Sequence, residues 1–272
     1  MSATSGVGLS GLDVLEKRLE QDMAWLKIPA PAWTPTLERN GQAVYDVVVI
    51  GAGMAGLTAS AMLLRYGIHN QVVYDQAPQG LEGPWLTYAR MDTLRSAKDL
   101  VGPAMGLPAL TFRAYYEARF GADAWSALGK IPRPLWAEYL LWLRTVLKIP
   151  VKNGIQVTRI QPRADGVVQI ELTRDGQEQT ALARHVVLAN GRDGLGGPAI
   201  PAFAYTLNKK YWAHSAEAID FSALQNKRVI VVGGGASAMD NAATALEAGA
   251  GRVDLLIRRK DLPRVHKFNG IK

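Results

Sequence analysis

One pattern of strand, glycine-rich turn, helix and strand occurs twice in the sequence, at an offset of 182 positions that relates, for example, Gly51 to Gly233. The mostly apolar run 45–50 precedes Gly-Ala-Gly-Met-Ala-Gly, and the mostly apolar run 228–232 precedes Gly-Gly-Gly-Ala-Ser-Ala. An Ala- or Leu-rich stretch of helical length follows each turn. Short continuous apolar strands are typical of a parallel sheet that is buried on both faces. The repeat therefore predicts an α/β chain with two βαβ units.

The first turn contains the residues that a dinucleotide site requires. Gly51 permits the tight turn out of the strand, Gly53 lets the backbone approach a pyrophosphate, and Gly56 allows the helix to pack closely. The phosphates would lie at the positive end of the helix. Asp75 ends the second strand, where a carboxylate accepts hydrogen bonds from ribose hydroxyls.

The second turn differs from the first in its third glycine and in the end of its second strand. Ala238 replaces the third glycine, which the motif tolerates because the position requires a small residue. Arg258 and Arg259 stand where a site for NAD would carry Asp or Glu, and guanidinium groups suit a 2′-phosphate. We therefore expect NADPH here, with a solvated basic turn as the alternative. The candidate residues are Gly233, Gly235, Ser237, Ala238, Arg258 and Arg259.

Composition restricts the chemistry further. The 272 residues are 48% hydrophobic and 20% charged, which excludes collagen-like, coiled-coil and disordered chains. The sequence has no cysteine, so a redox dithiol, a thiolate zinc site and an iron–sulfur cluster are all excluded. Its 4 scattered histidines show no metal-ligand spacing, and we expect no metal site. Because the two units suggest different ligands, hydride from NADPH would pass to a second redox cofactor, for which FAD is the obvious candidate.

The net charge of +7 lies mostly at the C-terminal end, so we do not expect nucleic-acid binding. The acidic residues Asp13, Glu16 and Glu20 argue against a secretory signal. The uncharged run 47–64 contains three glycines and predicts a strand, a turn and a helix instead of a membrane span. We expect a cytoplasmic protein. The basic residues near the C-terminus are Arg258, Arg259, Lys260, Arg264, Lys267 and Lys272.

Hydrophobic periodicity and turn residues predict the remaining elements. Helices are expected at 9–27, 110–121 and 134–148, a β-meander at 155–161, 166–173 and 178–183, and a separate buried strand at 185–189. We expect an N-terminal helix with a Pro-rich linker (1–43), an incomplete FAD-binding domain (44–200) and part of an NADPH-binding domain (201–272). The predicted class is a doubly wound, Rossmann-like FAD/NAD(P)-binding α/β fold with a β-meander and a second, partial Rossmann unit.

The sequence resembles the two-dinucleotide-domain flavoproteins, in particular the flavin-containing, Baeyer–Villiger and N-hydroxylating monooxygenases, over most of 44–265. Gly83-Pro84-Trp85 stands where that group has a Gly-Gly-x-Trp turn near the flavin. The segment 133–142, with its aromatic residues, is similar to a helix of that group. VVLANG at 186–191 is similar to the strand ending in Ala-Thr-Gly that leaves the flavin domain.

His214 lies where the Baeyer–Villiger enzymes have Phe-x-Gly-x-x-x-His, although Asn208 and Lys210 replace the first two fixed residues. The resemblance gives His214 a mechanistic or positioning role, and a surface or capping histidine is the alternative. Flavin domains of this group end in a late segment, so we expect a C-terminally truncated chain.

The resemblance implies that NADPH reduces FAD and that an oxygen atom from O2 reaches a small organic substrate. It places Trp85 beside the flavin and leaves an oligomer possible. Two alternatives stay open: an NADPH-dependent flavin reductase or oxidase, and a non-catalytic dinucleotide-binding fragment.

Overall fold

The computed structural model describes residues 10–192, 194 and 196–261. The chain divides into two compact units. The first unit extends to Leu86 and continues from Thr93 to Gly196, whereas the second contains Thr87–Asp92 and the chain from Gly197 onward. The sequence did not indicate that 87–92 groups with the second unit. Within that unit, the Arg90 side chain donates to the carbonyl of Glu217 at 2.9 Å.

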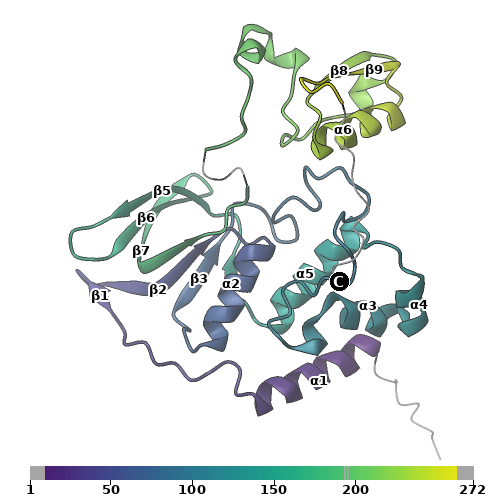
Figure 1. Cartoon of the computed structure of the whole chain (residues 1–272). Coiled ribbons are helices and arrows are strands. Elements are labelled where there is room, and N and C mark those ends of the chain that lie inside the picture. Colours follow the sequence, from purple (N-terminus) through teal and green to yellow (C-terminus); the bar gives the residue numbers. More distant parts are fainter. Residues whose placement is uncertain (1–9, 193, 195, 262–272) are drawn as a thin grey trace, which may run out of the picture. The chain divides into compact units, whose positions relative to one another are not determined.

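The first unit is built on a seven-stranded sheet of order β4-β3-β2-β7-β6-β5, and β1 pairs with β2 outside this path (Figure 1). β2 is parallel to β3 and to the end of β7, and β4 is parallel to β3. This confirms the predicted βαβ unit and Rossmann-like class. The strands are β1 (Glu38–Arg39), β2 (Gln42–Ile50), β3 (Gln71–Tyr74), β4 (Val151–Lys152), β5 (Gln156–Pro162), β6 (Val168–Arg174) and β7 (Gln177–Leu188).

The helices of the first unit begin and end at the expected types of residue. The Ser10 side chain accepts from the amide of Asp13 at 3.2 Å and caps α1. Thr111 caps α3, and Gly121, with φ 88°, ends it. Figure 1 shows α2 against the sheet and the other helices grouped beside it. They are α1 (Gly11–Trp25), α2 (Met54–Arg65), the 3₁₀ turn η1 (Pro108–Leu110), α3 (Phe112–Phe120), α4 (Ala122–Ala127) and α5 (Arg133–Val146).

The sequence-based division of 178–183 and 185–189 into two strands is wrong, because β7 is continuous across both segments. Its first part is antiparallel to β6, and its last part is parallel to β2. One strand therefore joins the meander to the parallel sheet. The pairing partner changes near Ala183, which is fully buried, and no turn residue is needed there.

The aromatic residues of α5 belong to the core. Trp136, Tyr139 and Trp142 are buried, and Tyr139 packs edge-on against Phe112 with ring centroids 5.4 Å apart. The Tyr139 hydroxyl donates to the carbonyl of Leu110 at 2.6 Å. Burial raises the pKa of this phenol above its ordinary value. These rings thus hold α5 against α3.

The second unit repeats the first βαβ pattern with one parallel strand pair, β8 (Arg228–Val232) and β9 (Arg252–Leu256), and the helix α6 (Ala236–Glu247). Gly67 after α2 and Gly249 after α6 have φ values of 79° and 90°, so both helices end in the same left-handed turn. The predicted repeat is therefore confirmed. Shorter 3₁₀ turns precede it: η2 (Ala202–Thr206), η3 (Lys209–Tyr211) and η4 (Ser222–Leu224). Within the described part of the chain, no helix combines the length and apolar character needed to cross a bilayer.

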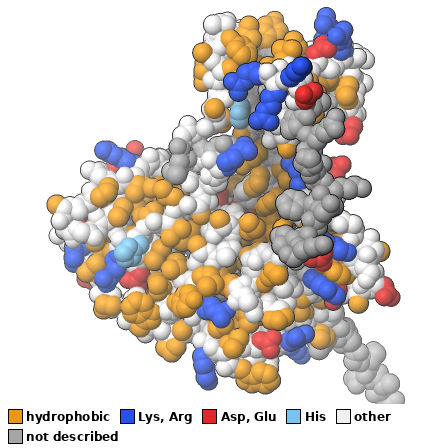
Figure 2. All heavy atoms as spheres, in the orientation of Figure 1, with side chains coloured by type: hydrophobic (Ala, Val, Ile, Leu, Met, Phe, Trp, Pro, Cys, Tyr) orange, Lys and Arg blue, Asp and Glu red, His pale blue; other side chains and the backbone are white. Residues whose placement is uncertain are grey.

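The β8–β9 pair is only partly covered, because the residues of both strands are half-buried or exposed. Ile230, Val232 and Leu256 are 60%, 55% and 54% exposed, whereas the central residues of β2 are almost fully buried. Figure 2 shows hydrophobic side chains at the surface of this unit. Local unfolding is easier where few apolar contacts cover the backbone hydrogen bonds. We therefore expect faster amide hydrogen exchange in β8 and β9 than in β2 and β7, measured peptide by peptide. Equally slow exchange in all four strands would contradict this expectation.

Candidate functional site

The first glycine turn is compressed between α2 and the end of β7. Gly51 has φ 101°, and a Cβ atom there would lie 2.4 Å from the carbonyl oxygen of Ala189. A Cβ atom on Gly56 would lie 1.8 Å from the carbonyl oxygen of Gly51. Only glycine fits either position without movement of the backbone.

Gly53 is different, because nothing in the described part of the protein requires glycine there. It caps α2 with φ −66°, and among the described residues a Cβ atom would meet only the Cα of Gly83, at 3.9 Å. No described side chain caps this end of α2. A bare helix N-terminus with an open approach is what a pyrophosphate needs, so the residues present fit a dinucleotide.

Asp75 lies directly after β3, beside the same turn. One carboxylate oxygen accepts from the amide of Ala52 at 2.7 Å, and the other accepts from the amide of Ala77 at 2.8 Å. A carboxylate has about four acceptor positions, so Asp75 retains capacity for ribose hydroxyls. The structure thus brings Gly51, Gly53, Gly56 and Asp75 together at the carboxyl edge of the parallel strands, where α/β sheets bind ligands.

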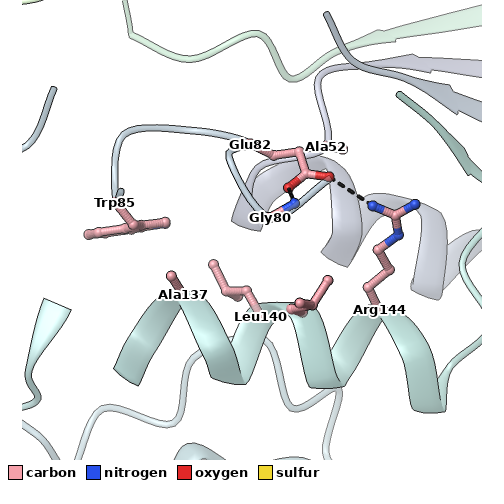
Figure 3. A pocket seen from close by; sticks show the side chains of 8 residues that line it. Ala52, Gly80, Glu82, Trp85, Ala137, Leu140 and Arg144 are labelled. Carbon is pink, nitrogen blue, oxygen red and sulfur yellow. Dashed lines mark hydrogen bonds and ion pairs between the residues drawn. The ribbon is translucent and has the colours of Figure 1, made fainter. Parts of the chain in front are cut away.

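Trp85 lines a small pocket next to this turn (Figure 3). Its indole nitrogen is buried and has no hydrogen-bond partner among the described residues, and the same holds for Trp136, which it meets edge-on at 6.2 Å. An unpaired buried donor costs about 1–3 kcal/mol. Trp85 therefore offers an unused donor to a ligand. The pocket is lined by Ala52, Gly80, Glu82, Trp85, Ala137, Leu140, Leu141 and Arg144.

Two residues of this pocket, Glu82 and Arg144, were not found by sequence reasoning. Their side chains form an ion pair of 2.7 Å and are only 10% and 14% exposed (Figure 3). They are 62 residues apart in the chain. The signal in the sequence is weak: a glutamate one residue before Gly83-Pro84-Trp85, and an arginine near the end of a mostly apolar helix.

The second glycine turn repeats the geometry in a looser form. Gly235 caps α6 without a side-chain hydrogen bond, and no heavy atom of the described residues lies within 4 Å of a Cβ placed there. A Cβ atom on Gly233 would lie 3.6 Å from that of Ala238, which is ordinary contact and explains why alanine is accepted. Ser237 lies in the first turn of α6, and its carbonyl accepts from Asn241 at 2.7 Å.

Arg258 and Arg259 lie at the same edge as the second glycine turn. β8 and β9 are parallel, and the amide of Gly233 donates to the carbonyl of Leu256 at 2.9 Å. Both arginines are exposed, and neither makes a hydrogen bond or ion pair with another described residue. They are thus available to an anion beside this turn. The remaining predicted basic residues, Arg264, Lys267 and Lys272, lie outside the described residues.

His214 belongs to a turn of the second unit. Its Nδ1 accepts from the amide of Ala216 at 3.1 Å, and its own amide donates to the Glu217 carboxylate at 3.0 Å. Hydrogen bonds from Lys209, and then from the His214 amide, lower the pKa of Glu217. These contacts suit the capping alternative. Among the described residues, no group of three or more His, Asp and Glu side chains is placed to hold a metal ion.

A known protein matches this chain over most of its length. The FAD-dependent urate hydroxylase of Xanthomonas campestris pv. campestris is 43% identical over 254 residues, which are 93% of this chain and 53% of that protein. The chain thus spans about half the length of this curated relative.

Solved structures agree in fold. The ornithine hydroxylase of Pseudomonas aeruginosa has a TM-score of 0.65 and 20% identity, over 79% of this chain and 55% of its own. A bacillithiol disulfide reductase of Bacillus cereus has a TM-score of 0.58 and 21% identity, over 80% of this chain and 60% of its own.

These likenesses confirm the expected resemblance to flavoproteins of the monooxygenase group. The family described as pyridine nucleotide-disulphide oxidoreductase matches residues 45–268, which include both glycine turns and both strand ends. The chain belongs to the pyridine nucleotide-disulphide oxidoreductase family.

Proposed function

We propose that the chain is an FAD-dependent NADPH oxidoreductase of the monooxygenase type, which uses O2 to oxygenate a small organic substrate. The observation that carries the proposal is the bare end of α2 at Gly53, beside Asp75 and the unpartnered Trp85 donor. We assign this site to FAD and residues 44–200 to its domain. When bound, FAD would supply the redox chemistry, accepting hydride and delivering reducing equivalents to O2.

The proposed role of the second unit, 201–272, is to bind NADPH. Gly233, Gly235, Ser237 and Ala238 would receive the pyrophosphate at the start of α6, and Arg258 and Arg259 would bind the 2′-phosphate. His214 stays a low-priority candidate, since its described contacts are those of a turn. A cytoplasmic location also stays a prediction.

The lack of cysteine separates this chain from the dithiol chemistry in the family's description. No thiol pair within these 272 residues can take the reducing equivalents, so we propose a bound or diffusing acceptor. O2 with a small organic molecule satisfies this requirement. Because the 43% identical relative is named a urate hydroxylase, urate is the first substrate to test.

The test combines the FAD-loaded chain, NADPH and urate in an oxygen electrode. We expect O2 consumption that depends on urate, with urate and NADPH lost in equal amounts. Hydrogen peroxide formed in the amount of NADPH consumed, with urate unchanged, would instead show an oxidase. Absence of NADPH oxidation with every substrate tried would favour a non-catalytic dinucleotide-binding fragment.

A further inference from the structure

The geometry points to Glu82 and Arg144 as a positioning pair that holds the Gly83–Trp85 segment against the first glycine turn. This inference rests on the proposed FAD site and adds two residues to it. Neither residue is assigned a contact with the cofactor. Their role is to fix the backbone that faces Gly53 before FAD binds.

Both oxygens of the Glu82 carboxylate accept hydrogen bonds from the protein. One oxygen accepts from Arg144 Nη1 and from Asn153 Nδ2, both at 2.7 Å, and the other accepts from the amide of Gly80 at 2.7 Å. Figure 3 shows the carboxylate between Gly80 and the guanidinium. Because both charges are largely buried, removal of either partner leaves the other uncompensated, which is strongly unfavourable.

These hydrogen bonds join three parts of the first unit. Arg144 belongs to α5, Asn153 directly follows β4, and Glu82 lies in the loop after β3. Asn153 also donates to the carbonyl of Ala77 at 2.9 Å, which ties the start of the same loop. The loop that begins at Asp75 and leads to Trp85 is therefore held at both its start and its end.

A second arginine of α5 holds the other side of the segment, since Arg133 donates to the backbone carbonyl of Trp85. Arg133 and Arg144 are 11 residues apart, about three helical turns, so they lie on one face of α5. Ala137 and Leu140, on the pocket side, lie between them. The segment held by this face of α5 includes Gly83. The Cα of Gly83 lies 3.9 Å from a Cβ atom built on Gly53.

The experiment measures FAD affinity and loop protection in the same variants. Arg144→Met removes the donor and keeps an unbranched apolar side chain, and Glu82→Gln with Arg144→Met removes both charges so that none is left buried alone. Arg163→Met is the matched control, because it breaks an ion pair with Asp165 of 2.9 Å in the same unit, outside this loop. FAD binding is followed by titration, and hydrogen exchange is followed in peptides covering 76–86 of the cofactor-free chain.

We expect both Arg144 variants to raise the FAD dissociation constant and the exchange rate of 76–86 by roughly tenfold or more, with little change for Arg163→Met. Arg144→Lys, which keeps the charge, should restore part of the affinity. Unchanged exchange in 76–86, or unchanged FAD affinity in folded variants, would overturn the positioning role. If exchange rises but the unaltered chain binds no FAD, the loop-holding role stands and the proposed function fails.

Discussion

Replacing Gly53 with valine is expected to abolish FAD binding while the chain stays folded. The substitution places a branched side chain at the start of α2, in the space that a pyrophosphate must enter to reach the helix amides. We expect the FAD dissociation constant to rise about 100-fold or more, which corresponds to about 2.7 kcal/mol. Flavin content after purification and FAD titration measure this effect.

The fold should tolerate this valine because Gly53 has an ordinary negative φ, and the nearest atom to a Cβ there is Gly83 Cα at 3.9 Å. Gly51→Ala, in contrast, should impair folding, because its φ is 101° and its Cβ would lie 2.4 Å from Ala189. Gly129→Val is the matched control, since Gly129 is exposed and a Cβ there meets no atom of the described chain within 4 Å. Normal flavin content in Gly53→Val would refute the assignment of FAD to this turn.

Loss of the paired arginines after β9 is expected to erase most of a preference for NADPH over NADH. Arg258→Ala with Arg259→Ala removes two exposed guanidinium groups at the edge that carries Gly233. A lost charge-assisted contact to phosphate is worth about 1.5–3 kcal/mol, so NADPH affinity should fall roughly ten- to hundredfold. NADH affinity should change little, because NADH lacks the 2′-phosphate.

The control removes the same amount of positive charge at the opposite end of the two strands. Arg228 and Arg252 begin β8 and β9, where both pair with Asp254. Alanine at both positions should leave the ratio of NADPH to NADH affinity unchanged. If this control lowers the ratio as much as the Arg258 and Arg259 variant does, the effect is a general loss of positive charge and the proposed phosphate site is wrong.

The sequence alone predicted those parts of the fold that local patterns determine. The apolar runs, the glycine turns and the 182-residue repeat identified both βαβ units, and Thr111 and Gly121 marked the ends of α3. Each of these depends on residues close together in the chain, where capping and backbone conformation act directly.

Contacts between distant segments could not be predicted in this way. β7 was divided in two because its pairing changes from β6 to β2 without a turn. The Glu82–Arg144 pair joins residues 62 positions apart, and its burial depends on how α5 packs beside the loop after β3. The grouping of Thr87–Asp92 with the second unit likewise depends on contacts such as Arg90 with Glu217.

The visible absorption spectrum of the FAD-loaded chain, recorded without oxygen before and after NADPH, tests the central claim most directly. One sample then reports whether the first unit binds a flavin and whether NADPH bound at the second unit transfers hydride to that flavin. We expect the absorption band of oxidised, protein-bound flavin to be present and to bleach when NADPH is added. A chain that retains no flavin, or bound flavin whose band persists in excess NADPH, would contradict the account.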